Sequence, residues 1–186
     1  VDTFDELEHL TLPEPLGECE AFTTSGATST APWTYEGRVK NYDYKTIRDK
    51  GHYDKFKIFL EMGLLDLEPV NVKGQQVVPR DLFHAVVTPQ IDFPEDKDLL
   101  VLRVTCRGEK DGKPKSIEYT MIDFGDETTG FNAMSRMTGF PASIVAIMSA
   151  RGDNLRGAVP LEKSVPTDIF LNELKRRELS LSIREF

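Results

Sequence analysis

The segment Leu99–Phe124, LLVLRVTCRGEKDGKPKSIEYTMIDF, decides the fold class of this chain. Two runs with strongly alternating side chains, Leu99–Arg107 and Ser116–Phe124, flank a polar connection that contains Asp111-Gly112. An Asp-Gly pair favours the two-residue turn of a β-hairpin, because both turn positions need a positive φ. The sequence therefore predicts an antiparallel strand pair here.

Shorter patterns add helices and further strands to this hairpin. From His52 the apolar residues follow one helical stripe, and Gly63 suits the left-handed conformation that ends a helix. Alternation and proline or glycine signals predict strands at 20–23, 38–48 and 179–183, and helices at 79–88, 141–151 and 166–177. Residues 128–139 are expected to form a polar loop or short helix. The expected fold class is α+β, with a mixed, largely antiparallel sheet and helices on one face.

The composition is that of a globular domain, with 39% hydrophobic and 29% charged residues in a chain of 186. Residues 1–17 contain Pro13, Pro15 and Gly17 after Leu10 and are expected to form an extended lead-in segment. Residues 18–186 are expected to form a single domain.

The charge pattern narrows the possible partners. The net charge is −8, with acids and bases mixed along the chain, so the positive field that nucleic acid requires is absent. The longest apolar run, Ile144–Met148, is far too short to cross a bilayer.

Cys19 and Cys106 lack CxxC spacing and are expected to be free thiols of a reducing compartment. We therefore expect a cytoplasmic protein without a nucleic-acid or membrane partner.

A hydroxyl-rich turn is the first candidate for ligand binding. It can present hydroxyl and amide donors to a substrate carboxylate or to a cofactor. The same residue types are common in any surface turn, so both interpretations stay open. The candidate substrate contacts are Thr24, Ser25, Gly26 and Thr28.

The strand that follows carries Lys45, Thr46 and Arg48. Arg48 offers a planar guanidinium that suits a substrate carboxylate, although a structural ion pair is an alternative. Lys45 and Arg48 lie on opposite faces of a regular strand, because their spacing is odd. We take Arg48 and Thr46 as candidate substrate contacts and Lys45 as a candidate catalytic residue.

His52 is the second candidate catalytic residue. It follows Gly51 at the start of a predicted helix, and the ordinary pKa of histidine lies where proton transfer is useful. Capping the helix is the alternative role. His9 and His84 are assigned to structure, and the pattern of histidines and cysteines predicts no metal site.

A second polar cluster follows the predicted hairpin. Asp123 ends a strand, where a carboxylate can orient a substrate ammonium group or cap a turn. The next residues precede a helix, a place suited to anions, although packing against another domain explains them equally well. The residues expected to face a cofactor are Thr129, Gly130, Asn132 and Arg136.

Several of these segments together resemble the saccharopine dehydrogenase family. Glu20–Gly26 is similar to its E-A-F-x-T-x-G segment, and Lys45–His52 is similar to K-T-L-R-Y-P-G-H. Thr129–Gly139 is similar to T-G-x-T-A-M-x-R-T-T-G, and residues 157–162 and 170–177 are similar to the tail of the family. Order and spacing agree over roughly residues 14 to 184.

The resemblance implies a two-domain NAD(P)-dependent oxidoreductase that acts on the C–N bond of an amino acid or imine. This chain would be its C-terminal substrate-binding and dimerisation domain, similar in architecture to the C-terminal domain of glyceraldehyde-3-phosphate dehydrogenase. NAD or NADP would be held by an N-terminal Rossmann domain, because this chain has no Gly-rich phosphate loop. The chain alone is therefore expected to be a homodimer that binds no cofactor and is inactive.

Because the sequence departs from the family motifs at several positions, the resemblance does not predict the identity of the substrate. Asp49-Lys50 stands where the family has Tyr-Pro, and Asn132 and Met137 stand where it has Thr. The alternative function is a non-catalytic dimeric module that binds an amino acid or serves a structural role. A hydrolase is disfavoured, because the chain has neither a G-x-S-x-G nor an HExxH motif.

Overall fold

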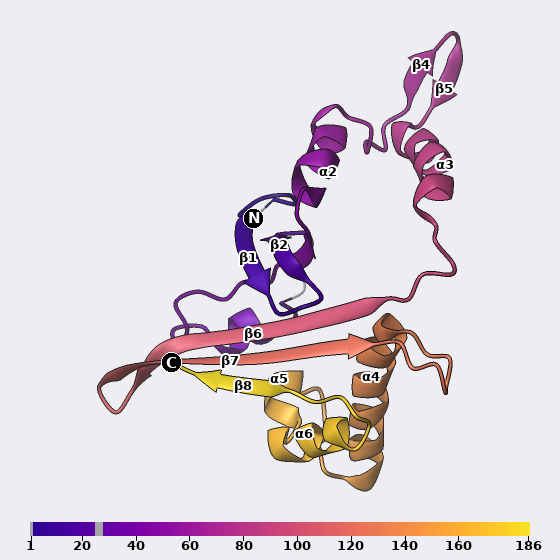
Figure 1. The fold of residues 1–186 in the computed structure, drawn as a ribbon. Helices are drawn as coiled ribbons and strands as arrows, with labels where there is room; N and C mark the ends of the chain where they lie inside the picture. The colour runs from indigo at the N-terminus through magenta and orange to yellow at the C-terminus, as the bar shows by residue number, and fades with distance from the viewer. Residues whose placement is uncertain (1, 25–27) are drawn as a thin grey trace. The chain divides into compact units, whose positions relative to one another are not determined.

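The strands and helices of the computed structural model, which describes residues 2–24 and 28–186, fall into two units (Figure 1). The first unit contains the chain up to Pro32 together with Glu36–Pro94, and the second contains Trp33–Tyr35 and Glu95–Phe186. The short helix α1 spans Ala31–Thr34. The prediction of one domain from residue 18 onward stays a prediction. None of the helices in the described chain is both long and apolar enough to span a membrane.

A three-stranded antiparallel sheet forms the first part of unit 1, in the order β1-β2-β3. Its strands are β1, Glu8–Leu12, β2, Gly17–Phe22, and β3, Thr46–Asp49. The predicted lead-in therefore contains a strand, which pairs along β2 and buries Leu12. The predicted strand at 38–48 is shorter than expected, because β2 offers pairing partners only to residues 46–49.

Helix α2, His52–Glu61, follows β3 and confirms the helix predicted from His52. Gly63 adopts a φ of 74°, and the Leu64 amide donates to the Phe59 carbonyl at 3.0 Å, so the helix ends where the sequence predicted. A small hairpin that the sequence analysis did not predict comes next, formed by β4, Val70–Val72, and β5, Gln75–Val77.

Helix α3, Pro79–Ile91, completes unit 1. It begins at the predicted proline but continues past Pro89, where the prediction ended it. A proline in the last turn removes only one helical hydrogen bond, so the helix tolerates it there.

In unit 2, β6, Leu99–Lys110, and β7, Lys113–Phe124, form the predicted hairpin. Asp111 and Gly112 have φ angles of 54° and 73°, the positive values that the two-residue turn requires. The strands continue up to this turn, further than the alternation alone predicted. Strand β8, Ser182–Glu185, pairs with β7 and gives the order β6-β7-β8.

Helices pack against one face of this second sheet (Figure 1). They are α4, Ala133–Arg151, α5, Leu161–Ser164, and α6, Thr167–Lys175. The core joins Met121 of β7 to Ile144 and Met148 of α4 and to Leu174 and Leu179. The α+β class is confirmed, although the strands divide over three sheets in place of one.

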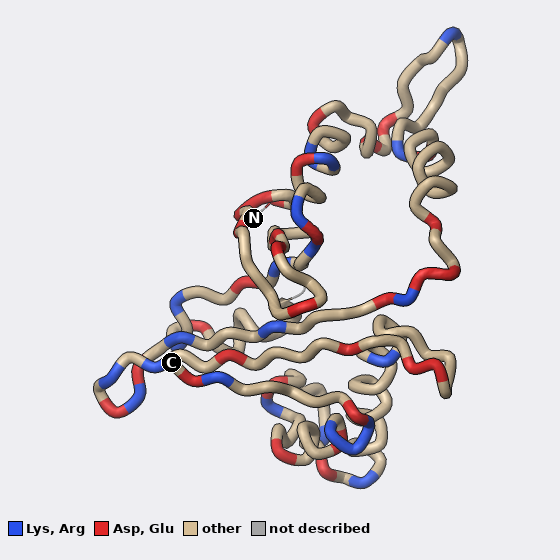
Figure 2. The backbone as a smooth tube through the Cα atoms, viewed as in Figure 1, with Lys and Arg blue, Asp and Glu red and all other residues tan. Residues whose placement is uncertain are grey.

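Acidic and basic side chains alternate along both units (Figure 2). The tip of the β6–β7 hairpin shows this mixture, with Lys110 and Lys113 on either side of Asp111. With charges of both signs mixed along the chain, the individual contacts of each charged group matter more than the net charge.

Candidate functional site

The first candidate site lies on one face of the β1-β2-β3 sheet. Glu20 of β2 lies directly opposite Arg48 of β3, and Phe22 lies opposite Thr46. Opposed residues share a face of an antiparallel sheet, and so do residues two apart on one strand. These four side chains therefore belong to one surface, which also receives the start of α2.

Two hydroxyl groups lie at the edge of this surface. The hydroxyl oxygens of Thr24 and Thr46 are 2.6 Å apart and share a hydrogen bond. Thr28 contributes its carbonyl to the Ala31 amide at 3.2 Å. Ser25 and Gly26, the other predicted contacts of the hydroxyl-rich turn, lie outside the described residues. The structure thus brings together Thr24 and Thr46 from the predicted substrate contacts.

Glu20 is a buried carboxylate, with only 3% of the residue exposed. It accepts hydrogen bonds from the backbone amides of Gly51, at 2.7 Å, and Tyr53, at 3.0 Å. Burial would raise the pKa of Glu20, but these two amides and the nearby His9 and His52 outweigh it and lower the pKa. Glu20 is therefore held in its charged form beneath the start of α2.

His52 lies within an aromatic stack. Its ring centroid is 4.3 Å from that of Phe56 and 6.0 Å from that of Phe22, and both pairs are stacked. Burial lowers the pKa of His52, and the positive charge of Arg48 lowers it further. The negative charge of Glu20 raises the pKa, but by less than these two effects lower it. The imidazole is therefore neutral at neutral pH and able to accept a proton. The helix-capping role considered for His52 belongs instead to Glu20.

Arg48 and Lys45 have different surroundings. Arg48 is exposed, and among the residues that the structure describes it forms no ion pair. The Nζ of Lys45 lies 3.5 Å from Glu8 and 3.9 Å from Asp43. Lys45 precedes β3, with acidic partners of its own, so the structure does not bring it into the group of Arg48 and His52. Its catalytic role stays a prediction.

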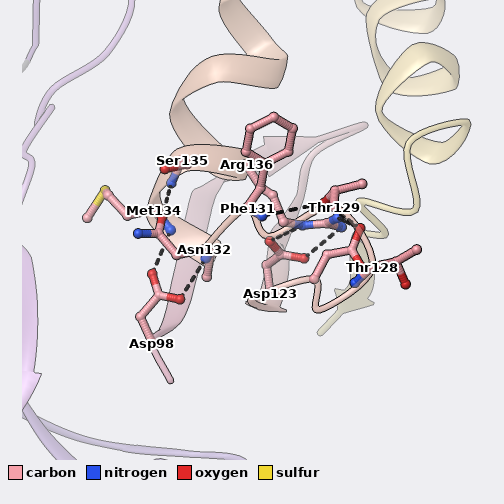
Figure 3. A network of polar contacts seen from close by, with 11 residues as sticks. Asp98, Asp123, Thr128, Thr129, Phe131, Asn132, Met134, Ser135 and Arg136 are labelled. Atoms are coloured by element: carbon pink, nitrogen blue, oxygen red, sulfur yellow. Dashed lines mark hydrogen bonds and ion pairs between the residues drawn. The ribbon is translucent and has the colours of Figure 1, made fainter. Parts of the chain in front are cut away.

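The second candidate site lies in unit 2, where β7 meets the start of α4 (Figure 3). Arg136 donates from Nε to Oδ2 of Asp123 at 2.9 Å and from its second terminal nitrogen to Oδ1 at 3.3 Å. Both residues are 7% exposed. Asp123 and Arg136, predicted as a substrate contact and a cofactor-facing residue, therefore neutralise each other inside the protein.

Thr129 and Gly130, which were also predicted to face a cofactor, form a turn beside this pair. Asp126 accepts from the Thr129 hydroxyl at 2.7 Å and from the Thr128 amide at 2.9 Å, which lowers the pKa of Asp126. Gly130 has a φ of 73° and donates its amide to the Asp126 carbonyl at 2.8 Å. These bonds close the turn on itself.

Two side chains cap α4. Asn132 accepts the Ser135 amide at 2.7 Å, and Asp98 accepts the amides of Ala133, at 2.7 Å, and Met134, at 2.9 Å. This double cap explains why α4 begins at residue 133 and not at Pro141, where the helix was predicted to start. The segment 128–139, predicted as a polar loop or short helix, is therefore helical from residue 133, as part of the longer α4.

The model of the family described as "Saccharopine dehydrogenase C-terminal domain" matches residues 2–179. The chain belongs to this family. Its fold is also similar to that of apo histidine-tagged saccharopine dehydrogenase (L-Glu forming) from Saccharomyces cerevisiae, with a TM-score of 0.69 and 14% sequence identity. The match covers 100% of this chain and 55% of the yeast chain, so this chain spans about half of that protein.

The second candidate site of this saccharopine dehydrogenase C-terminal domain, the α4 cluster, comprises Asp123, the 126–130 turn and the start of α4. It does not fit a dinucleotide pyrophosphate. Such a group binds to free amides at a helix N-terminus or Gly-rich turn. Here the first-turn amides of α4 already donate to Asp98 and Asn132, and Arg136 is enclosed with Asp123. Thr129, Gly130, Asn132 and Arg136 therefore do not form a pyrophosphate site, and contact with another part of a cofactor stays a prediction from the resemblance.

Glu20 and Asp98 were not among the predicted site residues. Glu20 stands between apolar residues in the strand CEAF, and an acidic residue inside an apolar strand is the signal that would have marked it. Asp98 lies 35 positions before the amide it caps, so no local pattern connects the two. Such long-range caps depend on the tertiary fold.

Proposed function

We propose that this chain is the substrate-binding part of a saccharopine-dehydrogenase-like NAD(P)-dependent oxidoreductase that acts on the C–N bond of an amino acid or imine. The observation that carries the proposal is that Arg48 and Phe22 share one face of the β1-β2-β3 sheet, where the ring of His52 stacks on Phe22. Arg48 is an exposed guanidinium without an ion pair among the described residues, and its charge acts on a half-buried imidazole. Membership of the saccharopine dehydrogenase C-terminal domain family supports the same function.

Each residue of this group has a role in the proposal. Arg48 binds a carboxylate of the substrate with two parallel hydrogen bonds, because the planar guanidinium matches a carboxylate in shape and charge. The Thr24 and Thr46 hydroxyls can rotate to donate to the same ligand. His52 accepts a proton from the substrate nitrogen or returns one to it, because its lowered pKa keeps the imidazole neutral.

The cofactor and the partners complete the proposal. NAD or NADP supplies the hydride chemistry and is held by a Rossmann domain outside this chain. The α4 cluster described above offers no pyrophosphate site, which supports a cofactor site elsewhere. The chain is also proposed to form a homodimer in the cytoplasm.

The test is an NMR titration of the isotopically labelled chain with saccharopine, and with cadaverine as a diamine that lacks carboxylates. We expect saturable amide shifts at Phe22–Thr24 and Arg48–Tyr53 with saccharopine and none with cadaverine. Shifts confined to unit 2, or equal shifts with both compounds, would overturn the proposed site. Binding of saccharopine without any reduction of NAD or NADP by the longer protein would favour the non-catalytic amino-acid-binding module.

A further inference from the structure

Glu20 has no part in the proposed chemistry, yet it is the most buried acidic residue among those described. A carboxylate leaves water only at a large energetic cost unless hydrogen bonds replace those of the solvent. Glu20 obtains these bonds from the amides of Gly51 and Tyr53, at 2.7 and 3.0 Å. Those two amides belong to the residues on either side of His52.

The two hydrogen bonds restrict the conformation of the backbone that carries His52. Gly51 has a φ of 87°, a left-handed conformation that glycine adopts readily. Glu20 thus holds the Lys50–Gly51 and His52–Tyr53 peptide groups, which restricts the backbone on both sides of His52 and the direction in which its side chain leaves that backbone. The stacked rings of Phe22 and Phe56 then limit the rotation of the imidazole.

Glu20 also connects His52 to the proposed carboxylate-binding arginine. In the sheet register, His9 of β1 and Arg48 of β3 lie on either side of Glu20 and share its face. The negative charge of Glu20 therefore lies next to both Arg48 and the start of α2. The buried Glu20 thus forms hydrogen bonds to the start of α2 and lies next to Arg48 in the sheet.

We propose that Glu20 is a positioning residue, which fixes the His52 imidazole beside Arg48 through the amides of Gly51 and Tyr53. The inference rests on the proposed function, because it assigns Glu20 a role only if His52 and Arg48 meet the same ligand. A plain helix cap would use the same hydrogen bonds. The two roles differ in what happens to the histidine when Glu20 is changed.

The test compares Glu20→Gln and Glu20→Asp with the wild-type chain, and uses Glu18→Gln as the matched control. Glu18 lies on the same strand but is exposed and pairs with Lys50. Glu20→Gln removes the charge and keeps one acceptor, whereas Glu20→Asp keeps the charge and shortens the reach to the amides. The ring resonances of His52 are followed by NMR as a function of pH, and thermal melting reports the fold.

The groups that act on His52 define the expected titration. Arg48 and Lys55 lower its pKa, and Glu20 and Asp49 raise it. We therefore expect a lower pKa of His52 in Glu20→Gln and no change in Glu18→Gln. In Glu20→Asp we expect weaker nuclear Overhauser contacts between the His52 and Phe56 rings. Both Glu20 variants should bind saccharopine about tenfold more weakly, a loss of about 1.4 kcal/mol.

A lower melting temperature with an unchanged His52 titration, ring contact and affinity would overturn the inference and leave Glu20 as a helix cap. If Glu20→Gln does not fold, unchanged His52–Phe56 contacts in Glu20→Asp would overturn it. If the wild-type chain binds no saccharopine, the proposed function fails. The His52 titration and ring contacts still decide whether Glu20 positions the histidine.

Discussion

Arg136 and Asp123 form a two-point ion pair that joins α4 to β7, with 2.9 Å between Nε and Oδ2. Asp126 lies 3.6 Å from the same guanidinium, and the Phe140 ring lies 5.5 Å from its central carbon. The hydrogen bond and charge of Asp123 outweigh burial and raise the pKa of Arg136. The pair therefore stays charged although it is buried.

We predict that Arg136→Met destabilises the chain by about 3–5 kcal/mol, because it leaves the buried Asp123 carboxylate without its partner. The double variant Arg136→Met/Asp123→Leu should recover part of this loss, since no uncompensated charge remains. Urea denaturation followed by circular dichroism measures both free energies of unfolding. A single variant as stable as the wild type, or a double variant less stable than the single one, contradicts this role.

This pair also shows what the sequence could predict. The alternation of 99–107 and 116–124 and the Asp111-Gly112 turn gave the hairpin, because both signals depend only on neighbouring residues. The T-G-F-N-A-M-S-R segment was recognised as a motif, but its role was expected to be cofactor contact. The Asp123–Arg136 bond arises only when the helix packs on the sheet.

In the first candidate site too, the face on which a strand residue lies could be predicted from the sequence, but its tertiary contacts could not. The odd spacing of Lys45 and Arg48 predicted opposite faces, and the structure gives Lys45 separate acidic partners. His52 was predicted as a candidate without knowledge of its aromatic neighbours or of Glu20. Strand alternation is a local property, whereas the charges of Arg48, Glu20 and Asp49, which act on the pKa of His52, come from β2 and β3.

Glu173 predicts how stability depends on pH. This buried carboxylate is surrounded by arginines at 2.6–3.2 Å, namely Arg151, Arg176 and Arg177. The hydrogen bonds from Arg177 and Arg151 and the charge of Arg176 outweigh burial and lower the pKa of Glu173 from 4.5 to about 2. The unfolded chain therefore takes up this proton at a higher pH than the folded chain.

We expect the stabilisation from Glu173 to be complete above pH 4.5 and to be lost as the pH falls to about 2. Glu173→Gln should therefore be less stable than the wild type at neutral pH, and the difference should shrink through this window. Urea denaturation at a series of pH values measures it. The control is Glu109→Gln, at an exposed position. A difference from the wild type that stays constant with pH contradicts the assignment.

The face of the β6-β7-β8 sheet opposite α4 and α6 bears on the proposed homodimer. Leu99 and Phe124 are cross-strand partners on this face, and they are 36% and 53% exposed. Large contiguous apolar patches on a protein surface commonly mark protein–protein contacts. We expect sedimentation equilibrium of the wild-type chain to give a dimer mass.

Leu99→Asp should shift the equilibrium towards the 21.0 kDa monomer, because it places a charge in the apolar contact. Leu102→Asp is the control, since Leu102 lies on the other face of the same strand, opposite Met121. Thermal melting of each variant separates unfolding from dissociation. A wild-type chain that sediments only as a monomer at micromolar concentration contradicts the homodimer, and equal effects of the two variants contradict this face.

The last prediction concerns Arg48, whose guanidinium is proposed to bind a substrate carboxylate. Arg48→Lys keeps the charge but loses the planar, two-point geometry, so ligand affinity and kcat/KM should fall by about 1.5–3 kcal/mol. The fold should be unaffected, because Arg48 is exposed and has no ion pair among the described residues. Binding of the nicotinamide cofactor by the longer protein should hardly change.

Arg38→Lys provides the matched control, because Arg38 is also exposed and lies in the same unit but outside β3. Saccharopine titrations, steady-state kinetics of the longer protein and thermal melting are compared for both variants. The substrate-binding role requires that only Arg48→Lys loses affinity while both variants melt as the wild type does. An unchanged affinity in Arg48→Lys, or a loss that follows a loss of stability, would show that Arg48 is structural and that the carboxylate binds elsewhere.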